Sequence, residues 1–220
     1  MAPSAPSVSD LKLVGGELCL DFANTVDWHA SDAPVERLVD YDSLVSWSRA
    51  AGILDGAGER RLRREAARNP AAAQKALKHA ITIREALYRI FVSVVHGQPI
   101  DASDADVLSE ALAQAHDHLR VVPAGNGLEW QWAGKPQDLE QMLWPVVRPA
   151  ADLLTSDRRS RLGQCADDRG CGWLFLDTSK NHRRRWCAME DCGNRAKAQR
   201  HCERSRRHEA VPRYEGRGTR

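Results

Sequence analysis

The stretch that decides the fold of this chain runs from Cys165 to Cys202 and reads CADDRGCGWLFLDTSKNHRRRWCAMEDCGNRAKAQRHC. It holds five of the chain's six cysteines. Four of them form two pairs that are 15 residues apart, and two sulfur pairs on either side of a short hairpin are typical of a tetrahedral zinc site. The sequence therefore predicts one structural Zn2+ ion, held by Cys165, Cys171, Cys187 and Cys192.

Two other interpretations of these cysteines stay open. Disulfide bonds compete with a metal site, although a chain without a recognisable signal peptide favours reduced thiols. Cys202 is a candidate to replace one of the four ligands, or to be a free thiol. Four thiolates fill the coordination sphere of zinc, whereas a catalytic zinc keeps one position for water. We therefore expect a structural site and no enzyme activity.

The segment around these cysteines predicts a small treble-clef-like zinc finger. Trp173, Phe175 and Leu176 have strand-forming side chains, and Arg184 to Cys187 is the expected partner strand. A helix is predicted over 196–208. Because the segment has few large apolar side chains, we expect that it needs zinc to fold.

Charge divides the chain into two unlike parts. Residues 156–220 carry 17 Lys and Arg against nine Asp and Glu, a net charge of +8, while the preceding residues carry 15 against 21, a net charge of −6. A Zn2+ ion with four thiolates would lower the C-terminal value to about +6. Opposite charges on two segments indicate two different roles.

The basic surplus of the finger predicts nucleic acid as its partner, because phosphates are the usual counter-surface for clustered cations. The expected contacts fall in the hairpin and on the following helix: Lys180, Arg183, Arg184, Arg185, Arg195, Lys197, Arg200 and Arg204. A solvated charged helix, or a helix that binds the chain's own acidic part, is the alternative. Asn194 is expected to cap the helix rather than read bases.

The remaining chain predicts a mainly helical α+β domain. Apolar periodicity indicates helices over 35–51 and 71–96, and a capping box at Ser103 and Asp106 starts another that runs to His118. Residues 56–68 are rich in Arg, Glu and Ala, and 137–155 is expected to be helical, with its two prolines giving either a kink or two short helices. Alternation over 11–25 indicates a short strand or hairpin arm, and 119–123 with 128–133 forms a hairpin.

These elements predict two domains with flexible ends. Residues 1–10 are expected to be disordered, 11–155 to form a regulatory domain, 156–210 the zinc finger and 211–220 a flexible tail. Asp21, Asn24 and Thr25 at the end of the predicted strand are candidates for a ligand pocket, and capping of the next turn is the alternative role. With no apolar run of about 20 residues, we expect no membrane span and a cytoplasmic protein.

Two motifs resemble known families. DTSKN at 177–181 and RRWCAMEDCGNRAK at 184–197 resemble the CGNR zinc finger, named for Cys192 to Arg195 here. GGELCLDFANTV at 15–26 is similar to the opening of the ABATE domain, a family described as stress-induced transcription regulators. In such fingers the first cysteine pair is often one residue closer, so this chain has a larger loop at 166–170.

The resemblance implies a zinc-containing, DNA-binding transcription regulator in stress response. Its N-terminal domain would sense a small-molecule effector or form a homodimer, and its finger would contact DNA. The alternative is a zinc-stabilised module that binds protein, or an RNA-binding protein without a role in regulating DNA.

Overall fold

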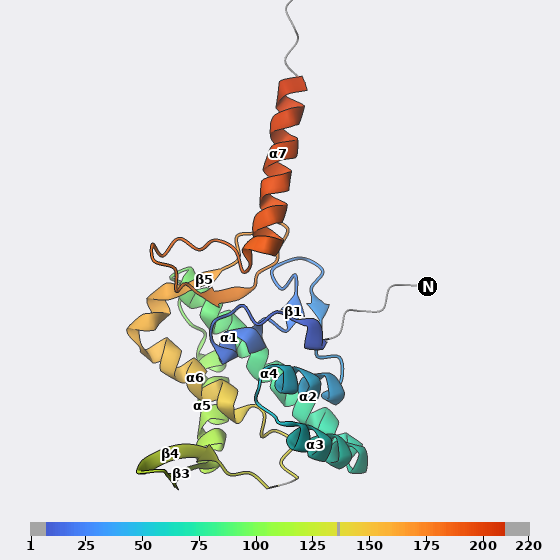
Figure 1. The fold of residues 1–220 in the computed structure, drawn as a ribbon, viewed down its shortest axis with the longest axis vertical. Helices are drawn as coiled ribbons and strands as arrows, with labels where there is room; N and C mark the ends of the chain where they lie inside the picture. The colour runs from blue at the N-terminus through green and yellow to red at the C-terminus, as the bar shows by residue number, and fades with distance from the viewer. Residues whose placement is uncertain (1–7, 136, 210–220) are drawn as a thin grey trace, which may run out of the picture.

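The computed structural model describes residues 8–135 and 137–209 as a body of packed helices from which one helix projects (Figure 1). The helices are α1 (Leu18–Ala23), α2 (Tyr41–Ala50), α3 (Gly56–Arg68), α4 (Pro70–Val95), α5 (Ala102–Asp117), α6 (Trp144–Thr155) and α7 (Asn194–Glu209). The strands are β1 (Val26–Asp27), β2 (Val35–Glu36), β3 (Leu119–Ala124), β4 (Gly127–Trp132), β5 (Leu162–Gln164) and β6 (Leu174–Leu176). They pair in sequence order into antiparallel two-stranded sheets, so the fold is α+β as predicted.

Helix α4 is the centre of the core. Its first turn is fixed by Pro70 and by the Asn69 side chain, which accepts a hydrogen bond from the Ala72 amide. Its buried face includes Ile83, Leu87 and Phe91, all at most 1% exposed, and α1, α2, α3 and α5 pack against it. The helix predicted over 71–96 is therefore confirmed.

The strand predicted over 11–25 is wrong, because Leu18–Ala23 forms α1. The alternation of Leu18, Leu20 and Phe22 suggested a strand, but Cys19 and Ala23 are apolar as well. Cys19, Leu20, Phe22 and Ala23 have the spacing of a helix face, and all four are buried. In an apolar run of only six residues, the two-residue repeat of a strand and the 3.6-residue repeat of a helix cannot be told apart without knowledge of the packing.

The starts of three other helices are set by local chemistry that the predictions missed. Helix α2 begins at Tyr41 because Asp40 forms a capping box with Ser43, and the preceding residues Val35–Glu36 pair with β1 instead. Helix α5 is capped by Asp101, which accepts a hydrogen bond from the Ser103 amide, so the capping box predicted at Ser103 is wrong. Helix α6 begins only at Trp144, with Pro145 in its first turn.

The hairpin of β3 and β4 is confirmed, and it lies at the end of the body opposite α7 (Figure 1). Gly125 in its turn has a φ of 54°, a backbone conformation that glycine adopts without a steric penalty.

In the finger, the strand predicted at 173–176 is confirmed in β6, but its partner is β5, with Leu162 opposite Leu176. The partner strand predicted at Arg184 to Cys187 is wrong. That segment is a loop that does not pair as a strand; the Arg185 carbonyl accepts a hydrogen bond from the Ala166 amide, and the Arg184 side chain donates to the Leu176 carbonyl of β6. The first cysteine pair thus lies in the connection between β5 and β6.

Strand β6 of the finger contributes to the core of the helical body. Leu174 and Leu176 of β6 belong to the same buried cluster as the residues of α1 and α4. The Asn24 carboxamide accepts from the Leu174 amide at 2.7 Å and donates to the Leu174 carbonyl at 2.9 Å, as a neighbouring strand would. Contacts of β6 thus cross the expected boundary at residue 155, while Phe175 and the four cysteines form a second buried cluster in the finger.

The structure describes only part of the two chain ends that are predicted to be disordered or flexible. Within the segment 1–10, Val8–Asp10 forms a 3-10 turn whose Val8 side chain is buried, and disorder at this end stays a prediction. Residues 1–7 and the predicted flexible tail at 211–220 lie outside the described residues.

Candidate metal centre and basic helix

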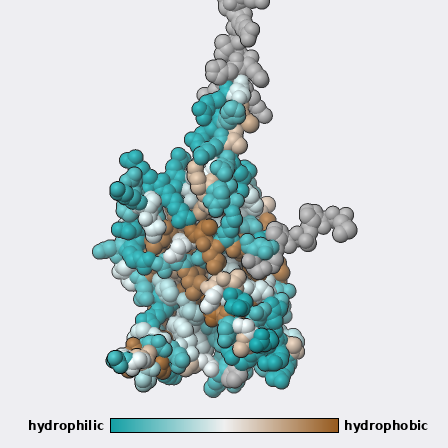
Figure 2. Space-filling model, in the orientation of Figure 1, coloured by the Kyte–Doolittle hydropathy of each residue, from teal (hydrophilic) through white to brown (hydrophobic). Residues whose placement is uncertain are grey.

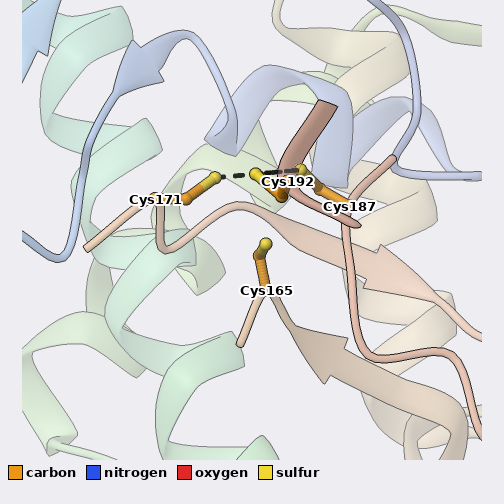
Figure 3. A group of neighbouring side chains, drawn as sticks. All are labelled: Cys165, Cys171, Cys187 and Cys192. Atoms are coloured by element: carbon orange, nitrogen blue, oxygen red, sulfur yellow. Dashed lines mark hydrogen bonds between the residues drawn. The ribbon is translucent and has the colours of Figure 1, made fainter. Parts of the chain in front are cut away.

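Four cysteines from two separate segments meet at the base of α7 (Figure 3). Cys165 and Cys171 lie in the connection between β5 and β6, and Cys187 and Cys192 lie in the segment that leads into α7. All four are buried, and their sulfur atoms lie within 4.8 Å of one another. The Sγ of Cys187 is 3.8 Å from that of Cys171 and 3.4 Å from that of Cys192.

This arrangement fits zinc. Tetrahedral coordination with Zn–S bonds of about 2.3 Å requires sulfur atoms about 3.8 Å apart, close to the separations seen. Sulfur donors at all four corners leave no position for water, which is the arrangement of a structural ion. Cys165, Cys171, Cys187 and Cys192 therefore hold one structural zinc ion. Cys202 is exposed on α7 and does not belong to this group.

Hydrogen bonds among the four cysteines shift their pKa values in opposite directions. The pKa of Cys165 is lowered, chiefly because the Cys171 thiol donates a hydrogen bond to its thiolate. The pKa values of Cys171, Cys187 and Cys192 are raised, chiefly through their hydrogen bonds with Cys165. Four adjacent thiolates need a positive ion among them, so zinc binding displaces protons from this cluster.

Arg195 supports the metal centre from outside. Its Nη2 lies 2.7 Å from the Cys192 Sγ and 3.2 Å from Oδ2 of Asp167, a buried carboxylate. Arg169 also bonds Asp167 and lowers the pKa of that carboxyl to about 2. Both guanidinium groups lie over the Trp28 ring, at 5.2 Å for Arg195 and 5.3 Å for Arg169. Arg195, predicted as a phosphate contact, is thus engaged at the metal centre.

Arg184 is engaged in the same way. Its Nη2 donates to the carbonyls of Val14, at 2.8 Å, and of Cys187, and its guanidinium lies 4.3 Å from the centroid of the Phe175 ring. It therefore joins the finger to the N-terminal segment instead of facing solvent. Two of the eight predicted nucleic-acid contacts have these structural roles.

The other six predicted contacts are exposed. Lys180, Arg183 and Arg185 lie in the loop after β6. Lys197, Arg200 and Arg204 lie on α7, where spacings of three and four residues put them on one face of the helix. His201 shares that face, and teal, hydrophilic residues predominate along the described part of α7 (Figure 2). We call Lys197, Arg200, His201 and Arg204 the basic stripe.

The two polar residues near the start of α7 bond to the chain itself. The Asn194 side chain donates to the Glu190 carbonyl at 3.1 Å, so it steadies the start of the helix without accepting from helix amides as a cap does. Gln199 donates to Asp168 at 3.1 Å and to Glu203 at 3.4 Å.

Asp21, Asn24 and Thr25, the candidates for a ligand pocket, lie around the C-terminal part of α1. Asp21 accepts from the Gly15 amide at 2.8 Å, and burial raises the pKa of its carboxyl to about 6. Thr25 donates to the Phe22 carbonyl at 2.8 Å, and Asn24 pairs with β6. These bonds go to preceding residues and to β6, not to the turn that follows, whose capping was the alternative role considered for them. A ligand pocket at these residues stays a prediction.

Asp167 and Trp28 belong to the site and were missed. Asp167 lies between the first two cysteines, but spacing alone does not distinguish it from its neighbour Asp168. Trp28 is far from the finger in sequence, and its φ of 56° is rare for a residue with a side chain. Its loop reaches the first knuckle through the His29 amide, which donates to the Cys171 carbonyl at 3.1 Å.

Comparison with protein families agrees with this architecture. The family model ABATE, described as "Putative stress-induced transcription regulator", matches residues 16–157. The chain belongs to the ABATE family. A second model, the CGNR zinc finger, matches residues 161–205, which include all four zinc ligands. No curated protein matches this ABATE chain at a significant level.

No helix that the structure describes has the features of a membrane span. Among the helices of residues 8–135 and 137–209, none combines the length and the apolar character needed to span a bilayer.

Proposed function

We propose that this ABATE protein is a DNA-binding transcription regulator in which α7 lies in the major groove. The observation that carries the proposal is the basic stripe on a helix that leads away from the body (Figure 1). Within the described residues its main packing partner is the turn Met189–Gly193 at its own base. A helix without an apolar face gains little from packing, so its charge is available to a partner.

The dimensions and the charge suit duplex DNA. The major groove is about 12 Å wide and admits one α-helix with its side chains. Lys197, Arg200 and Arg204 would contact phosphates on the groove walls, and Arg183 and Arg185 in the neighbouring loop would extend the contact along the backbone. The alternative in which the basic helix binds the acidic part of its own chain receives no support, because α7 leads away from that part (Figure 1).

The zinc ion would act by fixing the direction of α7. Cys192 lies two residues before the helix, and Arg195 in its first turn bonds both Cys192 and Asp167. The ion would thereby join the start of the helix to the connection between β5 and β6. A sensing or dimerising role of the N-terminal region remains a prediction.

The proposal is tested by fluorescence anisotropy with a labelled duplex of mixed sequence and the zinc-loaded full chain. We expect binding at low salt that weakens steeply as salt is added. Absence of binding at low salt would contradict the proposal. Tighter binding to an RNA hairpin than to DNA of equal length would instead support the RNA-binding alternative.

A further inference from the structure

A cavity of about 200 Å3 lies beside the zinc-binding sulfurs. Its lining includes Cys171, Cys187 and Cys192 together with Trp28, Trp173 and Arg195. Cys165 is not among the residues that line it. The volume is below the roughly 300 Å3 of a typical small-molecule site, but it admits molecules the size of water or hydrogen peroxide.

Among the three cysteines that line the cavity, Cys187 is the one whose Sγ lies near two other sulfur atoms. It lies 3.4 Å from Cys192 and 3.8 Å from Cys171. Zinc keeps its ligands as thiolates, which are the reactive form towards oxidants. The Arg195 guanidinium, whose Nη2 lies 2.7 Å from the Cys192 Sγ, lines the same cavity.

We propose that Cys187 and Cys192 form an oxidation site, at which a small two-electron oxidant such as hydrogen peroxide converts the two thiolates into a disulfide. The Cys187 thiolate attacks one peroxide oxygen, the O–O bond breaks, and the hydroxide that leaves takes a proton from solvent to become water. The Cys192 thiolate then attacks the sulfenic sulfur of Cys187, the S–S bond forms, and a second hydroxide leaves as water after protonation. Two thiolates thereby lose two electrons in total, and one peroxide is reduced to two waters.

Oxidation would remove the zinc-mediated connection of α7 without unfolding the rest of the molecule. Only Cys165 and Cys171 would remain as ligands, and two thiolates hold zinc far less tightly than four. The start of α7 would lose its connection to the ion, whereas β6 would stay in the core through Leu174, Leu176 and the Asn24 pairing. The proposal rests on the zinc centre and does not depend on DNA as the partner.

The test uses the zinc-loaded full chain with Cys202→Ser, because Cys202 is an exposed thiol that would react on its own. Hydrogen peroxide is added, zinc release is followed with a chromogenic chelator, and the disulfide is located by peptide mapping. We expect release of about one zinc per chain with a Cys187–Cys192 disulfide, and recovery after reductant and zinc are supplied. The bulky disulfide reagent 5,5′-dithiobis(2-nitrobenzoate) should release zinc at least about tenfold more slowly than peroxide under matched thiol reactivity, because access to the sulfurs is restricted.

Three results would overturn the proposal. One is retention of zinc at peroxide concentrations that fully oxidise Cys202 in the unmodified chain. Another is a disulfide mapped to a pair other than Cys187 and Cys192. The last is equal rates with the bulky and the small reagent, since these would mean that local unfolding, and not the cavity, exposes the sulfurs. Each readout is independent of DNA binding.

Discussion

At the scale of single residues, sequence identified the zinc ligands but not the roles of all the basic residues around them. Paired cysteines have one common use in a reduced chain, so their spacing was informative. Arginines serve equally well as phosphate contacts and as structural donors to carbonyls, carboxylates and thiolates. Arg184 and Arg195 therefore looked like their exposed neighbours until the structure placed Val14 and Asp167 beside them.

Arg195 is predicted to support zinc binding. Arg195→Gln removes a charged donor from Cys192 and leaves the buried Asp167 with one guanidinium partner fewer. Zinc affinity should fall by about 10- to 100-fold, as is usual when a group that bonds a metal ligand is lost. Competition with a chromogenic chelator measures this, and Arg200→Gln, an exposed position on the same helix, is the matched control. Equal zinc affinity in the two variants would show that Arg195 has no role at the metal.

Asp21 is predicted to make stability depend on pH. Burial raises its pKa in the folded state to about 6 from 3.8, so the folded chain binds this proton more tightly than the unfolded chain. Stability contributed by the protonated carboxyl is present below pH 4 and is lost as the pH rises towards 6. Asp21→Asn does not ionise, and its stability advantage over the unmodified chain should grow by on the order of 2 kcal/mol between pH 4 and pH 7.

Urea unfolding of both proteins at matched pH and saturating zinc gives this difference directly, because effects of pH on the metal site are common to both. Asp32→Asn, at an exposed position, controls for removal of a carboxylate. A difference between Asp21→Asn and the unmodified chain that is constant with pH would contradict the assignment.

At the scale of elements, long periodic segments were predictable and short ones were not. Helix α4 and the β3–β4 hairpin carry their signals within their own sequences, an apolar face in one and a glycine turn in the other. The six residues of α1 and the three of β5 take their conformation from the core and from β6, which no local pattern shows. Helix α7 differs from α1 and β5, because it is helical although no apolar face of it packs against the core.

Helix α7 is predicted to exchange its amide hydrogens rapidly when the protein is free. Its 16 residues match the length of α5, but α5 packs against α4 and α6. An isolated helix of this length is marginal in water, so opening should be frequent beyond its first turns. Hydrogen exchange followed by mass spectrometry should find α7 far less protected than α5 and more protected once duplex DNA is added. Equal protection of α5 and α7 in the free protein would indicate that α7 packs against a surface not yet identified.

At the scale of the whole molecule, hydrogen bonds and apolar contacts join the N-terminal region to the finger. Sequence predicted two domains because the charge changes sign and the motifs are separate, and composition does not report which strands join a distant core. The Asn24 pairing with Leu174 and the bond from the Leu176 amide to the Gly15 carbonyl, at 2.7 Å, cross that boundary.

The finger is therefore predicted not to fold alone. A fragment of residues 156–220 would expose the apolar side chains of β6 and lack the Asn24 and Val14 partners, so zinc alone should not order it. Two-dimensional NMR spectra of the fragment with zinc should show narrow dispersion, while the full chain with zinc shows wide dispersion. A well-dispersed spectrum of the fragment would mean that the metal suffices.

The basic stripe carries the central claim, and the salt dependence of DNA binding tests it most directly. Two triple variants remove the same charge from exposed helical positions: Lys197, Arg200 and Arg204→Gln on α7, and Arg60, Arg64 and Arg68→Gln on α3. The slope of log affinity against log salt is negative, and in the α7 variant its magnitude should decrease by about two to three units. Each lost phosphate contact removes about 0.9 from that magnitude. The α3 variant should keep the slope of the unmodified protein. An equal change in both variants, or none in the α7 variant, would contradict the account.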